Sequence, residues 1–546
     1  MICGTGFIFF LLLGFSLAVT LTGCGYSSFL PYANVPTVTP TGNIQHIVVI
    51  FQENVSFDHY FGTYPHALNL PGESPFNALP GTPAVDGLTQ SLMLDNPNSR
   101  NRRNGKGATN PFRLSPASAA TADQDHGYSA EQLAFDGGAM DLFPTSVGTA
   151  DSPKPGEGMA ATTGLTMAYY DGNTVTALWN YAQHFAMSDH FFGTTFGPSS
   201  LGAINLVSGQ TNGAVNDSNA EGSLASDRHG GYTLTGNANP VNDVCSSTIK
   251  AMVHMTGRNI GDLLNQAGFT WGFFHEGFNL GVTNGNGSSG CRRSHVAEFT
   301  QETSLDYTAS IEPFQFYAST ANPHHVRPTS VEVIGHANDF GTNHQYDLED
   351  FFDAVRAGNF PTVSFLKSAA YRDGHAGYSD PLDEQAFLVD TINFIEQRPE
   401  WSHTVIILAY DDSDGWYDHV HNVVNGSTTA RDGFSGEGRC GDGATALPGV
   451  GAGTLHAQGR CGYGPRLPLL VISPWAKPNY VSHAVTDQSS ILRFIEDTFL
   501  NQQRIGQGSY DAIAGSFADM LDLSAAAPQN ATLVVLDPAT GQIAQQ

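Results

Sequence analysis

The stretch IQHIVVIFQENVSFDHYFG (residues 44–62) runs from a series of β-branched and apolar residues directly into Glu53 and Asn54. Its first part, residues 44–51, predicts a buried strand. In open parallel sheets, ligands bind in the crevice beyond the carboxyl ends of the strands, so a Glu–Asn pair at this point is placed to hold a metal or a polar ligand. A capped turn is an equally good interpretation of the stretch alone, because Asn and Ser favour turns and Asp58 can cap a following helix.

Strand-like and helical patterns alternate along the rest of the chain. Further apolar runs predict strands at residues 269–274, 362–366, 404–410 and 467–472, and amphipathic patterns predict helices at 383–397 and 488–500. In the last of these, Ile491, Phe494, Ile495 and Thr498 stand at i, i+3, i+4 and i+7. This alternation predicts an α/β fold whose mainly parallel central sheet is covered by helices on both faces.

Loop-rich segments interrupt this pattern. Residues at about 63–122, 212–300 and 436–464 are rich in Gly, Pro, Asn and Ser and are expected to be insertions on the surface. Residues 525–546 show no strong periodicity and are expected to form a loose tail. We therefore predict a single domain at residues 43–524 that carries these insertions.

The overall charge is strongly acidic. The chain of 546 residues has 23 Lys and Arg against 51 Asp and Glu, a formal net charge of -28. Nucleic-acid binding is not expected, because proteins that bind phosphate backbones usually present a basic face. If the substrate is itself a phosphate, a local metal or a helix terminus must attract it, since the overall field repels it.

The N-terminus has the features of an export signal. Residues 7–21 are apolar, and LTGC at residues 21–24 resembles a bacterial lipoprotein cleavage box, in which Cys24 becomes the lipidated first residue of the mature chain. This predicts a signal peptide at 1–23 and a tether at 24–42. No Lys or Arg precedes the apolar run, so an ordinary secretory signal and an uncleaved membrane anchor are the alternatives. All three place the protein outside the cytoplasm, either attached to the bacterial membrane by the lipid on Cys24, facing the periplasm or cell exterior, or secreted.

Four cysteines remain in the exported chain. Cys245, Cys291, Cys440 and Cys461 suggest two disulfides in an oxidising compartment. Pairing of nearest neighbours, 245 with 291 and 440 with 461, is the simplest of the three possible connectivities.

A second strand delivers acidic residues to the edge of the sheet where Glu53 is expected. In TVIILAYDDSDGWYDHV (residues 404–420), the apolar run is followed at once by Asp411 and Asp412. With Glu53 and Asn54 they form an oxygen-rich set that suits a hard divalent cation. A turn with a helix N-cap is the alternative, because Asp-Asp-Ser-Asp-Gly is also good turn composition.

The segment FFGTTFGPSSLGAINLVSGQ (residues 191–210) offers a nucleophile. Ser199 and Ser200 follow Gly197-Pro198 at the expected start of a helix, where free N–H groups and the macrodipole stabilise an anion. Coordination to a divalent metal would activate such a hydroxyl without a catalytic triad. Alternatively, the serine is simply the helix N-cap.

Six segments, in order, resemble one known family. They are QENVSFDHYFG (52–62), DQDHGYSAEQ (123–132), FGPSSLGAINLVSGQT (196–211), DGHAGYSDPLDEQ (373–385), YDDSDGWYDHV (410–420) and GYGPRLPLLVISPWAKPNYVSH (462–483). The family is the bacterial phosphoesterase family that contains phospholipases C and the respiratory-burst-inhibiting acid phosphatases, within the alkaline-phosphatase-like superfamily. The resemblance runs from about residue 44 to residue 500 and implies an alkaline-phosphatase-like fold.

The resemblance also implies roles for individual residues. The metal ligands it implies are Glu53, Asn54, Asp411, Asp412 and Ser199, and the catalytic residues are Ser199 as nucleophile, His126, His375 and, as a weaker match in NPHHVRPTS, His325. The cofactor is a divalent metal ion whose identity and number the sequence does not specify. A histidine in such a site can neutralise phosphoryl oxygens or protonate the leaving oxygen.

Two differences separate the chain from the phospholipase C branch of that family. Around the nucleophile, phospholipases C have a sequence similar to GPTxPNR, and their paired acids are Asp-Glu. This chain has GPSSLGA and Asp-Asp at these positions. We therefore predict an exported, metal-dependent phosphoric ester hydrolase with a phosphoserine intermediate, in the first place an acid phosphatase acting on phosphomonoesters. The alternatives are a phospholipase C that cleaves phosphodiester headgroups and a non-catalytic surface lipoprotein that keeps the fold as a binding module.

Overall fold

The structure is a computed structural model that describes residues 42–148, 163–218, 223–226, 232–422 and 462–545, except residues 526, 529, 531 and 532. Several predictions fall outside these residues: the signal peptide at 1–23, nearly all of the tether and of the 436–464 insertion, and the Cys440–Cys461 disulfide. In the part of the chain that is described, no helix is long and apolar enough to cross a membrane.

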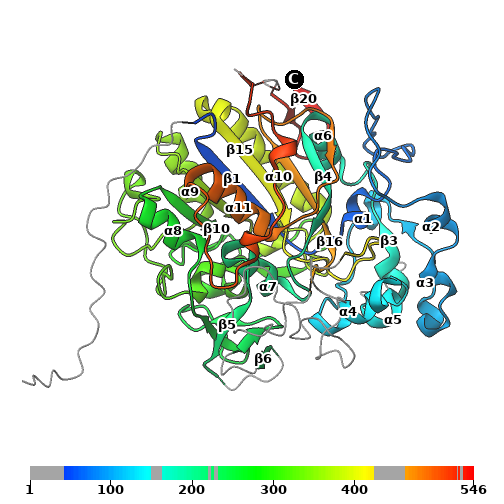
Figure 1. The fold of residues 1–546 in the computed structure, drawn as a ribbon, viewed down its shortest axis with the longest axis horizontal. Coiled ribbons are helices and arrows are strands. Elements are labelled where there is room, and N and C mark those ends of the chain that lie inside the picture. The colour runs from blue at the N-terminus through cyan, green and yellow to red at the C-terminus, as the bar shows by residue number, and fades with distance from the viewer. Residues whose placement is uncertain are drawn as a thin grey trace, which may run out of the picture.

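A nine-stranded sheet forms the centre of the molecule (Figure 1). Its order is β13-β10-β14-β1-β15-β16-β4-β17, and β18 also pairs with β4. The strands are β1 (His46–Gln52), β4 (Ala186–Phe192), β10 (Trp271–His275), β13 (Gln345–Tyr346), β14 (Val363–Lys367), β15 (Thr404–Tyr410), β16 (Arg466–Ile472), β17 (Tyr480–Ser482) and β18 (Thr486–Asp487). All neighbours pair in parallel except β16, which is antiparallel to β15 and β4. The predicted mixed α/β fold with a mainly parallel sheet is confirmed.

The central strands are apolar along their whole length because both faces of the sheet are covered. Every residue of β15 is buried, as is every residue of β1 except His46. Such strands are typical of parallel sheets between two helical layers. β1 and β15 pair in parallel with Gln52 opposite Tyr410, so the residues that follow these two strands emerge side by side.

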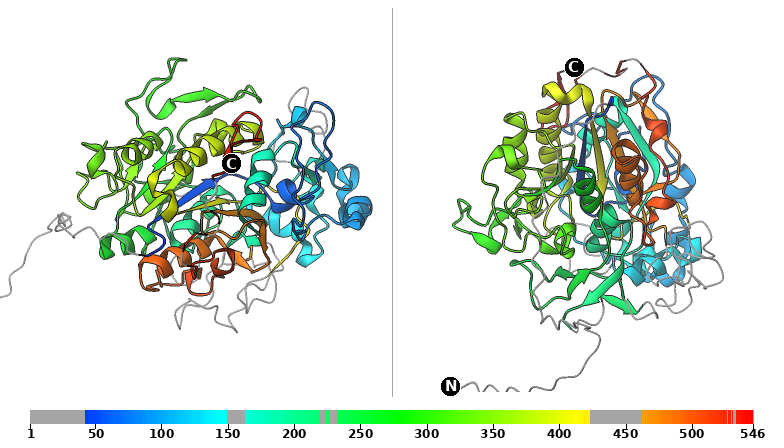
Figure 2. Two further views of the ribbon diagram at one scale, coloured as in Figure 1. Left: turned by 90° about the horizontal axis from the view of Figure 1, so that it is seen from above. Right: turned by 60° about the vertical axis from the view of Figure 1, so that its left-hand side comes forward.

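Helices lie on both faces of the sheet (Figure 2), with α9 and α10 on one face and α7 and α11 on the other. The longer helices are α4 (Tyr128–Phe135), α6 (Thr176–His184), α7 (Ser199–Ser208), α8 (Ile260–Ala267), α9 (Leu348–Arg356), α10 (Pro381–Glu396) and α11 (Gln488–Phe499). α10 begins two residues before the predicted start because Asp380 caps it, accepting from the N–H groups of Leu382 and Asp383, and Pro381 occupies its first turn.

The insertions differ in content. The first holds the short helices α2 (Gln90–Leu94) and α3 (Pro97–Arg100), and α1 (Phe57–Phe61) lies just before it. The second contains a five-stranded sheet: β5 (Asn212–Asn216), β6 (Leu224–Ser226), β7 (Tyr232–Leu234), β8 (Asn239–Pro240) and β9 (Met252–Met255). β10 lies within the predicted range 212–300 but is a strand of the central sheet, so this range is not one continuous insertion. The predicted Cys245–Cys291 disulfide is present and joins the segment before β10 to the segment after it.

The C-terminal tail differs from the prediction of a loose segment. Its described part forms the hairpin β19 (Val535–Leu536) and β20 (Ile543–Gln545), which docks on α10. The Val534 N–H donates to Glu396 Oε2 at 2.8 Å, and the Leu536 N–H donates to Asn393 Oδ1 at 3.1 Å. Val534 and Leu536 are buried. The segment is too short for a detectable sequence period, but two apolar side chains and two polar anchors are enough to hold it.

Candidate functional site

The carboxyl ends of β1 and β15 bring four of the predicted residues together. The Asn54 N–H donates to Asp411 Oδ1 at 2.9 Å, the Asp411 N–H donates to the Gln52 carbonyl at 3.1 Å, and the Val55 N–H donates to the Asp412 carbonyl at 2.9 Å. Glu53, Asn54, Asp411 and Asp412 are all at most 3% exposed. The two strands therefore deliver these side chains to one buried place, as their sequence positions predict.

Asn54 connects this set to a further carboxylate. Its φ is 63°, a left-handed conformation that Asn adopts more readily than most residues. Its Nδ2 donates to Asp414 Oδ1 at 3.0 Å. Asp414 is fully buried, and it lies in the YDDSDG motif, where only the two aspartates before it are predicted to be ligands. A third aspartate thus belongs to the same site.

Several oxygens of this set lack a hydrogen-bond partner among the described residues. They are Asn54 Oδ1, Asp411 Oδ2, Asp412 Oδ2 and Asp414 Oδ2. Burial, together with the neighbouring Asp412 and Glu53, raises the pKa of Asp411 well above its usual range, and burial with Glu131 does the same for the pKa of Asp412. Buried carboxylates with free oxygens need a cation or shared protons. An all-oxygen donor set fits a hard divalent cation such as Mg²⁺, Ca²⁺ or Mn²⁺.

Lys367 is the neighbour of Glu53 that the sequence analysis missed. It ends β14, the strand beside β1, and its Nζ lies 3.2 Å from Glu53 Oε1 and 3.4 Å from Asp373 Oδ2. Burial raises the pKa of Glu53, but the Lys367 ammonium and His375 outweigh burial and hold that pKa below its ordinary value. Glu53 therefore stays ionised in the buried site. The only sequence signal for Lys367 is a cation at the end of a predicted strand.

Ser199 begins α7, and α7 packs directly on the backbone of Asp411. A Cβ added to Gly202 would lie 2.1 Å from the carbonyl oxygen of Asp411, so only glycine permits this approach. The alternative nucleophile, Ser200, has its hydroxyl committed, since Oγ donates to the Ser310 carbonyl at 2.8 Å. Ser199 is therefore the better candidate of the two, at the positive end of a ten-residue helix.

We expect Gly202→Ala to destabilise the protein by about 1–3 kcal/mol, because the new methyl group overpacks the contact between α7 and Asp411. Urea unfolding measures the change. Gly285→Ala is the matched control, since a Cβ there meets nothing within 4 Å, and it should leave the unfolding midpoint unchanged. Equal midpoints for both variants would contradict the close packing.

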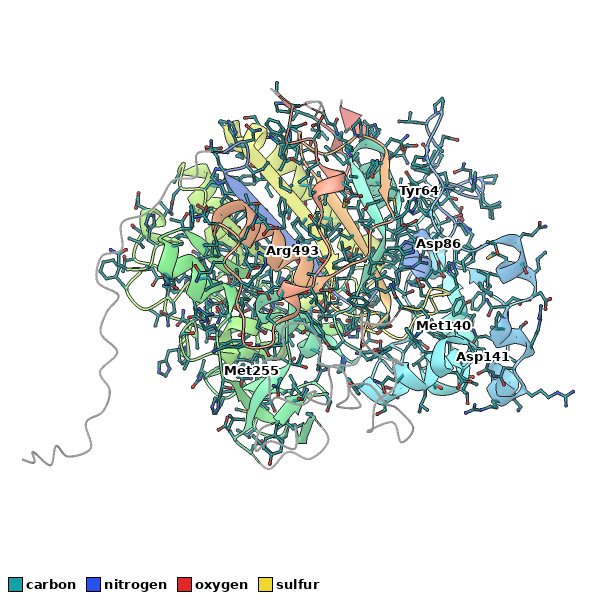
Figure 3. All side chains as sticks on the ribbon, in the orientation of Figure 1. Tyr64, Asp86, Met140, Asp141, Met255 and Arg493 are labelled. Carbon is teal, nitrogen blue, oxygen red and sulfur yellow. A yellow bond between two sulfur atoms is a disulfide. The ribbon has the colours of Figure 1, made fainter. Side chains whose placement is uncertain are left out.

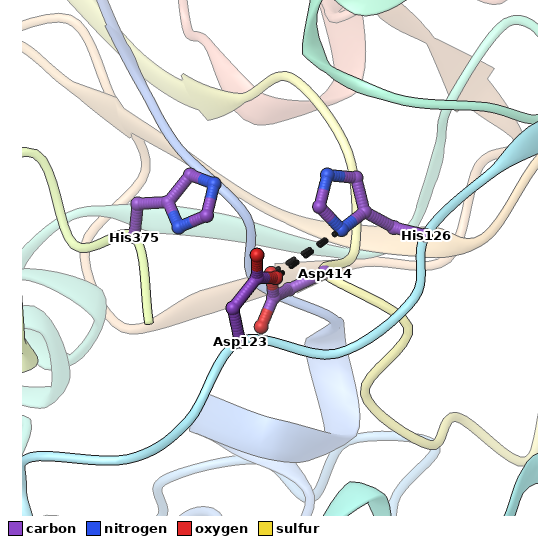
Figure 4. A group of neighbouring side chains, drawn as sticks. All are labelled: Asp123, His126, His375 and Asp414. Atoms are coloured by element: carbon purple, nitrogen blue, oxygen red, sulfur yellow. Dashed lines mark ion pairs between the residues drawn. The ribbon is translucent and has the colours of Figure 1, made fainter. Parts of the chain in front are cut away.

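His126 and His375 face each other across two carboxylates (Figure 4). Their ring centroids are 5.8 Å apart, and one donor atom from each of Asp123, His126, His375 and Asp414 lies within 4.8 Å of the others. His126 Nδ1 lies 2.9 Å from the Gln124 carbonyl and 3.4 Å from Asp414 Oδ1, and His375 Nδ1 lies 2.6 Å from the Ala376 carbonyl. When Nδ1 donates to a carbonyl, Nε2 of each ring is the nitrogen left to meet a ligand.

Glu131 hydrogen bonds both to residues 197–199, here called the serine segment, and to residues 411–414, here called the aspartate turn. Its Oε2 accepts from the Gly197 N–H at 2.7 Å, and its Oε1 accepts from Ser413 Oγ at 2.8 Å. Burial raises the pKa of this carboxyl to about 7. One side chain thus holds the residue two positions before Ser199 and the residue directly after Asp412. Glu131 lies in the DQDHGYSAEQ motif, but no local pattern reveals its two partners.

His325 lies in a different group of contacts. Its ring stacks on Phe278, with centroids 3.9 Å apart and planes 7° apart. Nδ1 lies 2.9 Å from the Phe278 carbonyl and Nε2 lies 3.1 Å from Asp243 Oδ1. Both ring nitrogens are therefore engaged, and neither bonds to the residues of the site described above.

Comparison with known proteins agrees with these motifs. The model of the Phosphoesterase family matches residues 44–500. Non-hemolytic phospholipase C of Pseudomonas aeruginosa is 24% identical over 471 residues, which cover 84% of this chain and 54% of that protein. Phospholipase C B of Mycobacterium tuberculosis is 24% identical over 465 residues, which cover 84% of this chain and 73% of that protein. Non-specific phospholipase C6 of Arabidopsis thaliana is 25% identical over 148 residues, 25% of this chain and 24% of that protein.

The chain thus spans about half the length of the Pseudomonas relative and about three quarters of the mycobacterial one. The family match, in contrast, covers most of the chain, from β1 through α11, and includes every element that supplies the residues of the site. The protein therefore belongs to the Phosphoesterase family.

Proposed function

We propose that the protein hydrolyses phosphoric esters with Ser199 as the nucleophile. The observation that carries the proposal is a buried all-oxygen donor set beside the helix that Ser199 begins, in which oxygens of Asp411, Asp412 and Asp414 have no hydrogen-bond partner in the described part of the chain. Phosphoryl transfer depends mainly on positioning and on stabilising negative charge, and this arrangement offers both.

Glu53, Asn54, Asp411 and Asp412, with the Ser199 hydroxyl, would hold a divalent cation. When bound, such an ion supplies Lewis-acid activation of the hydroxyl and neutralises phosphoryl oxygens. The chain's own contribution is to fix the ligands: Lys367 keeps Glu53 ionised, and Glu131 positions both the serine segment and the aspartate turn.

In the reaction, Ser199 gives up its hydroxyl proton to solvent, and its Oγ forms a bond to phosphorus while the bond to the leaving oxygen breaks in line. The imidazolium form of His126 or His375 donates its Nε2 proton to the leaving oxygen and becomes a neutral imidazole. A water then attacks phosphorus from the vacated side and gives one proton back to that imidazole, while the bond from phosphorus to Oγ breaks, Oγ takes up a proton from solvent and the phosphoryl product leaves. The positive end of the α7 macrodipole, where Ser199 stands, stabilises the charge that develops on phosphoryl oxygens.

The names of the relatives change which class of substrate we place first. Those compared above carry the name phospholipase C, so we place cleavage of phosphodiester headgroups first and phosphomonoester hydrolysis second. The specific observation in favour of the monoesterase is the GPSSLGA segment and the Asp411–Asp412 pair. Export, with a lipid on Cys24 or as a secreted protein, would bring the enzyme to extracytoplasmic phosphate esters, membrane lipids included.

The deciding experiment is paired hydrolysis of p-nitrophenyl phosphorylcholine and p-nitrophenyl phosphate by the purified protein, with divalent cations and with a chelator. Turnover of the diester that the chelator removes supports the phospholipase C type, and turnover of the monoester alone supports the phosphatase. No turnover of either substrate with Mg²⁺, Ca²⁺, Mn²⁺ or Zn²⁺ would refute the proposal and favour a binding module.

We expect Glu131→Ala to lower kcat by roughly 100-fold, because a displacement of about 1 Å at a reacting group costs on that order. KM should change little, since Glu131 is not placed to touch the substrate. Glu131→Gln keeps an acceptor oxygen and should retain much more of kcat. Exposed Glu349→Ala on α9 is the control. A full kcat in Glu131→Ala would show that the two turns hold their positions without this carboxylate.

A further inference from the structure

A separate group of imidazoles and carboxylates lies on β4, two strands away from β15 in the sheet. His190 Nδ1 lies 2.8 Å from Asp189 Oδ1, and His483 Nδ1 lies 2.8 Å from the same oxygen and 3.0 Å from Oδ2. One donor atom of each of these three residues lies within 4.8 Å of the others. Two imidazoles from distant parts of the sequence therefore converge on one carboxylate.

A fourth possible ligand, Asp86, lies against the same group and is labelled in Figure 3. Its backbone N–H donates to Asp189 Oδ2 at 2.7 Å, and its Oδ2 lies 3.8 Å from His190 Nε2. Asp86 comes from the first insertion, so the group joins three segments of the chain. No role in ester hydrolysis is assigned to any of its members.

The backbone holds this group firmly. β17 pairs in parallel with β4, and Ser482 lies opposite Ser188. His483 and Asp189 are the next residues along the two strands, so the pairing brings them side by side. The guanidinium of Arg466, which is fully buried, donates from Nη1 to the carbonyl of Asp86 at 2.7 Å and to that of Asp189 at 3.0 Å. The donors are thus positioned by strands and by a buried cation, which is the support that a ligand site requires.

Charge and access also suit a cation. Asp189 is fully buried; burial raises its pKa, but hydrogen bonds from His190, the Asp86 N–H and His483 outweigh burial and lower that pKa below its ordinary value. The side chain of His483 is 63% exposed, so the group opens to solvent. The formal charge of -28 favours the approach of cations.

The donor types distinguish this group from the oxygen-only set around Asp411. Two imidazole nitrogens with one or two carboxylate oxygens suit Zn²⁺ and related transition metals, which prefer nitrogen ligands more than Mg²⁺ or Ca²⁺ do. Bonds of about 2.0–2.2 Å in a tetrahedral site place neighbouring donors roughly 3.3 Å apart. The contacts of 2.8–3.0 Å must therefore open by roughly 0.5 Å, and the exposed His483 side chain is free to make that movement.

We propose that Asp189, His190 and His483, with Asp86 beside them, bind a divalent transition-metal cation of the zinc class, which ties the first insertion to β4 and to the segment after β17. The ion displaces the protons that the two imidazoles share with Asp189. This site is independent of the proposed hydrolysis, because it uses other residues and another type of ligand.

The test is calorimetric titration of the chelator-stripped full chain with Zn²⁺, in excess Mg²⁺ to occupy oxygen-only sites. We expect His483→Ala, and separately His190→Ala, to weaken the binding of one Zn²⁺ equivalent on the order of 100-fold or more. Even residues that only hydrogen bond to a metal's ligands contribute roughly 10- to 100-fold to metal affinity. His254→Ala is the matched control: its Nδ1 lies 2.7 Å from Asp217 Oδ2, and among the described residues no second imidazole joins that pair. It should keep the full stoichiometry.

Thermal unfolding gives a second readout, because Zn²⁺ should raise the Tm of the wild type and of His254→Ala but not of His483→Ala. His483→Gln, which keeps a polar side chain of similar length, should behave as His483→Ala does. Hydrolysis of the nitrophenyl esters should be the same in wild type and His483→Ala. Equal zinc stoichiometry and affinity in wild type and His483→Ala would overturn the proposal.

Discussion

Replacing Ser199 with alanine is expected to lower kcat by on the order of 10³-fold or more, because removal of a nucleophile leaves only binding and charge stabilisation to act on the substrate. The fold should survive. Pro198 caps α7 without a side-chain hydrogen bond, and Ser199 follows it as the first helical residue, where alanine is well tolerated. Acid-quenched mass spectrometry should detect a phosphorylated Ser199 in the wild type and none in the variant.

The neighbouring serine supplies the control for this prediction. Ser200→Ala removes a buried hydrogen bond to the Ser310 carbonyl and should cost about 1 kcal/mol of unfolding free energy. It should leave most of the turnover. The reverse result, an active Ser199→Ala and an inactive Ser200→Ala, would transfer the nucleophile to Ser200 and show that its hydroxyl leaves Ser310 during catalysis.

The parts of the fold that the sequence predicts best are the long apolar runs. β15 covers the predicted residues 404–410, because the charged Asp411 follows the apolar run directly. β1 ends within one residue of its predicted end, because polar and charged residues likewise follow its apolar run. β4 is different, since AMSDHFF places Asp189 and His190 inside a buried strand. Tertiary hydrogen bonds to its carboxylate, from the Asp86 N–H and from the His483 ring, explain why Asp189 is accepted there.

The residues of the site, like the strands, are predicted only in part by the sequence. Its motifs predict which residues the strand ends of β1 and β15 bring together, because parallel strands deliver their carboxyl ends to one edge of the sheet. The residues that hold those motifs in place are not predicted. Lys367 acts through a neighbouring strand, and Glu131 joins two turns that are far apart in sequence. A motif match also predicts a role for His325, but the match does not reveal that its ring bonds to the Phe278 carbonyl and to Asp243.

The unpartnered oxygens predict an unusual combination of effects for Asp412→Asn. The variant should lose turnover by on the order of 10³-fold, since it removes a charged ligand of the proposed cation. Without metal, however, it should be more stable than the wild type, by roughly 1–2 kcal/mol, because a buried carboxylate with a free oxygen is neutralised. The asparagine oxygen can still accept from the Asp414 N–H, as Asp412 Oδ1 does at 2.7 Å.

The pH dependence of that stability has a definite sign. Burial and Glu131 raise the pKa of Asp412 in the folded protein, so the folded state binds more protons than the unfolded one. The metal-free wild type should therefore lose stability as the pH rises from about 4, the ordinary carboxyl value, towards the raised pKa. Asp412→Asn should flatten this decline, and bound cation should abolish it in the wild type. Urea unfolding between pH 4 and pH 8, with and without chelator, measures both.

Asp418→Asn separates this effect from a general consequence of changing a buried aspartate. Asp418 is also fully buried and lies in the same segment, but it pairs with the guanidinium of Arg466 at 3.1 Å. Removing its charge takes a partner from Arg466, which keeps Asp58, and this loss offsets the gain from neutralising a carboxyl whose pKa burial raises to about 6. Asp418→Asn should therefore change the stability little, with or without metal, whereas Asp412, which has no cation beside it among the described residues, should gain stability on the same change. If Asp412→Asn were instead destabilising without metal, the Asp412 carboxylate would have a compensating partner, and the metal-site proposal would lose its main support.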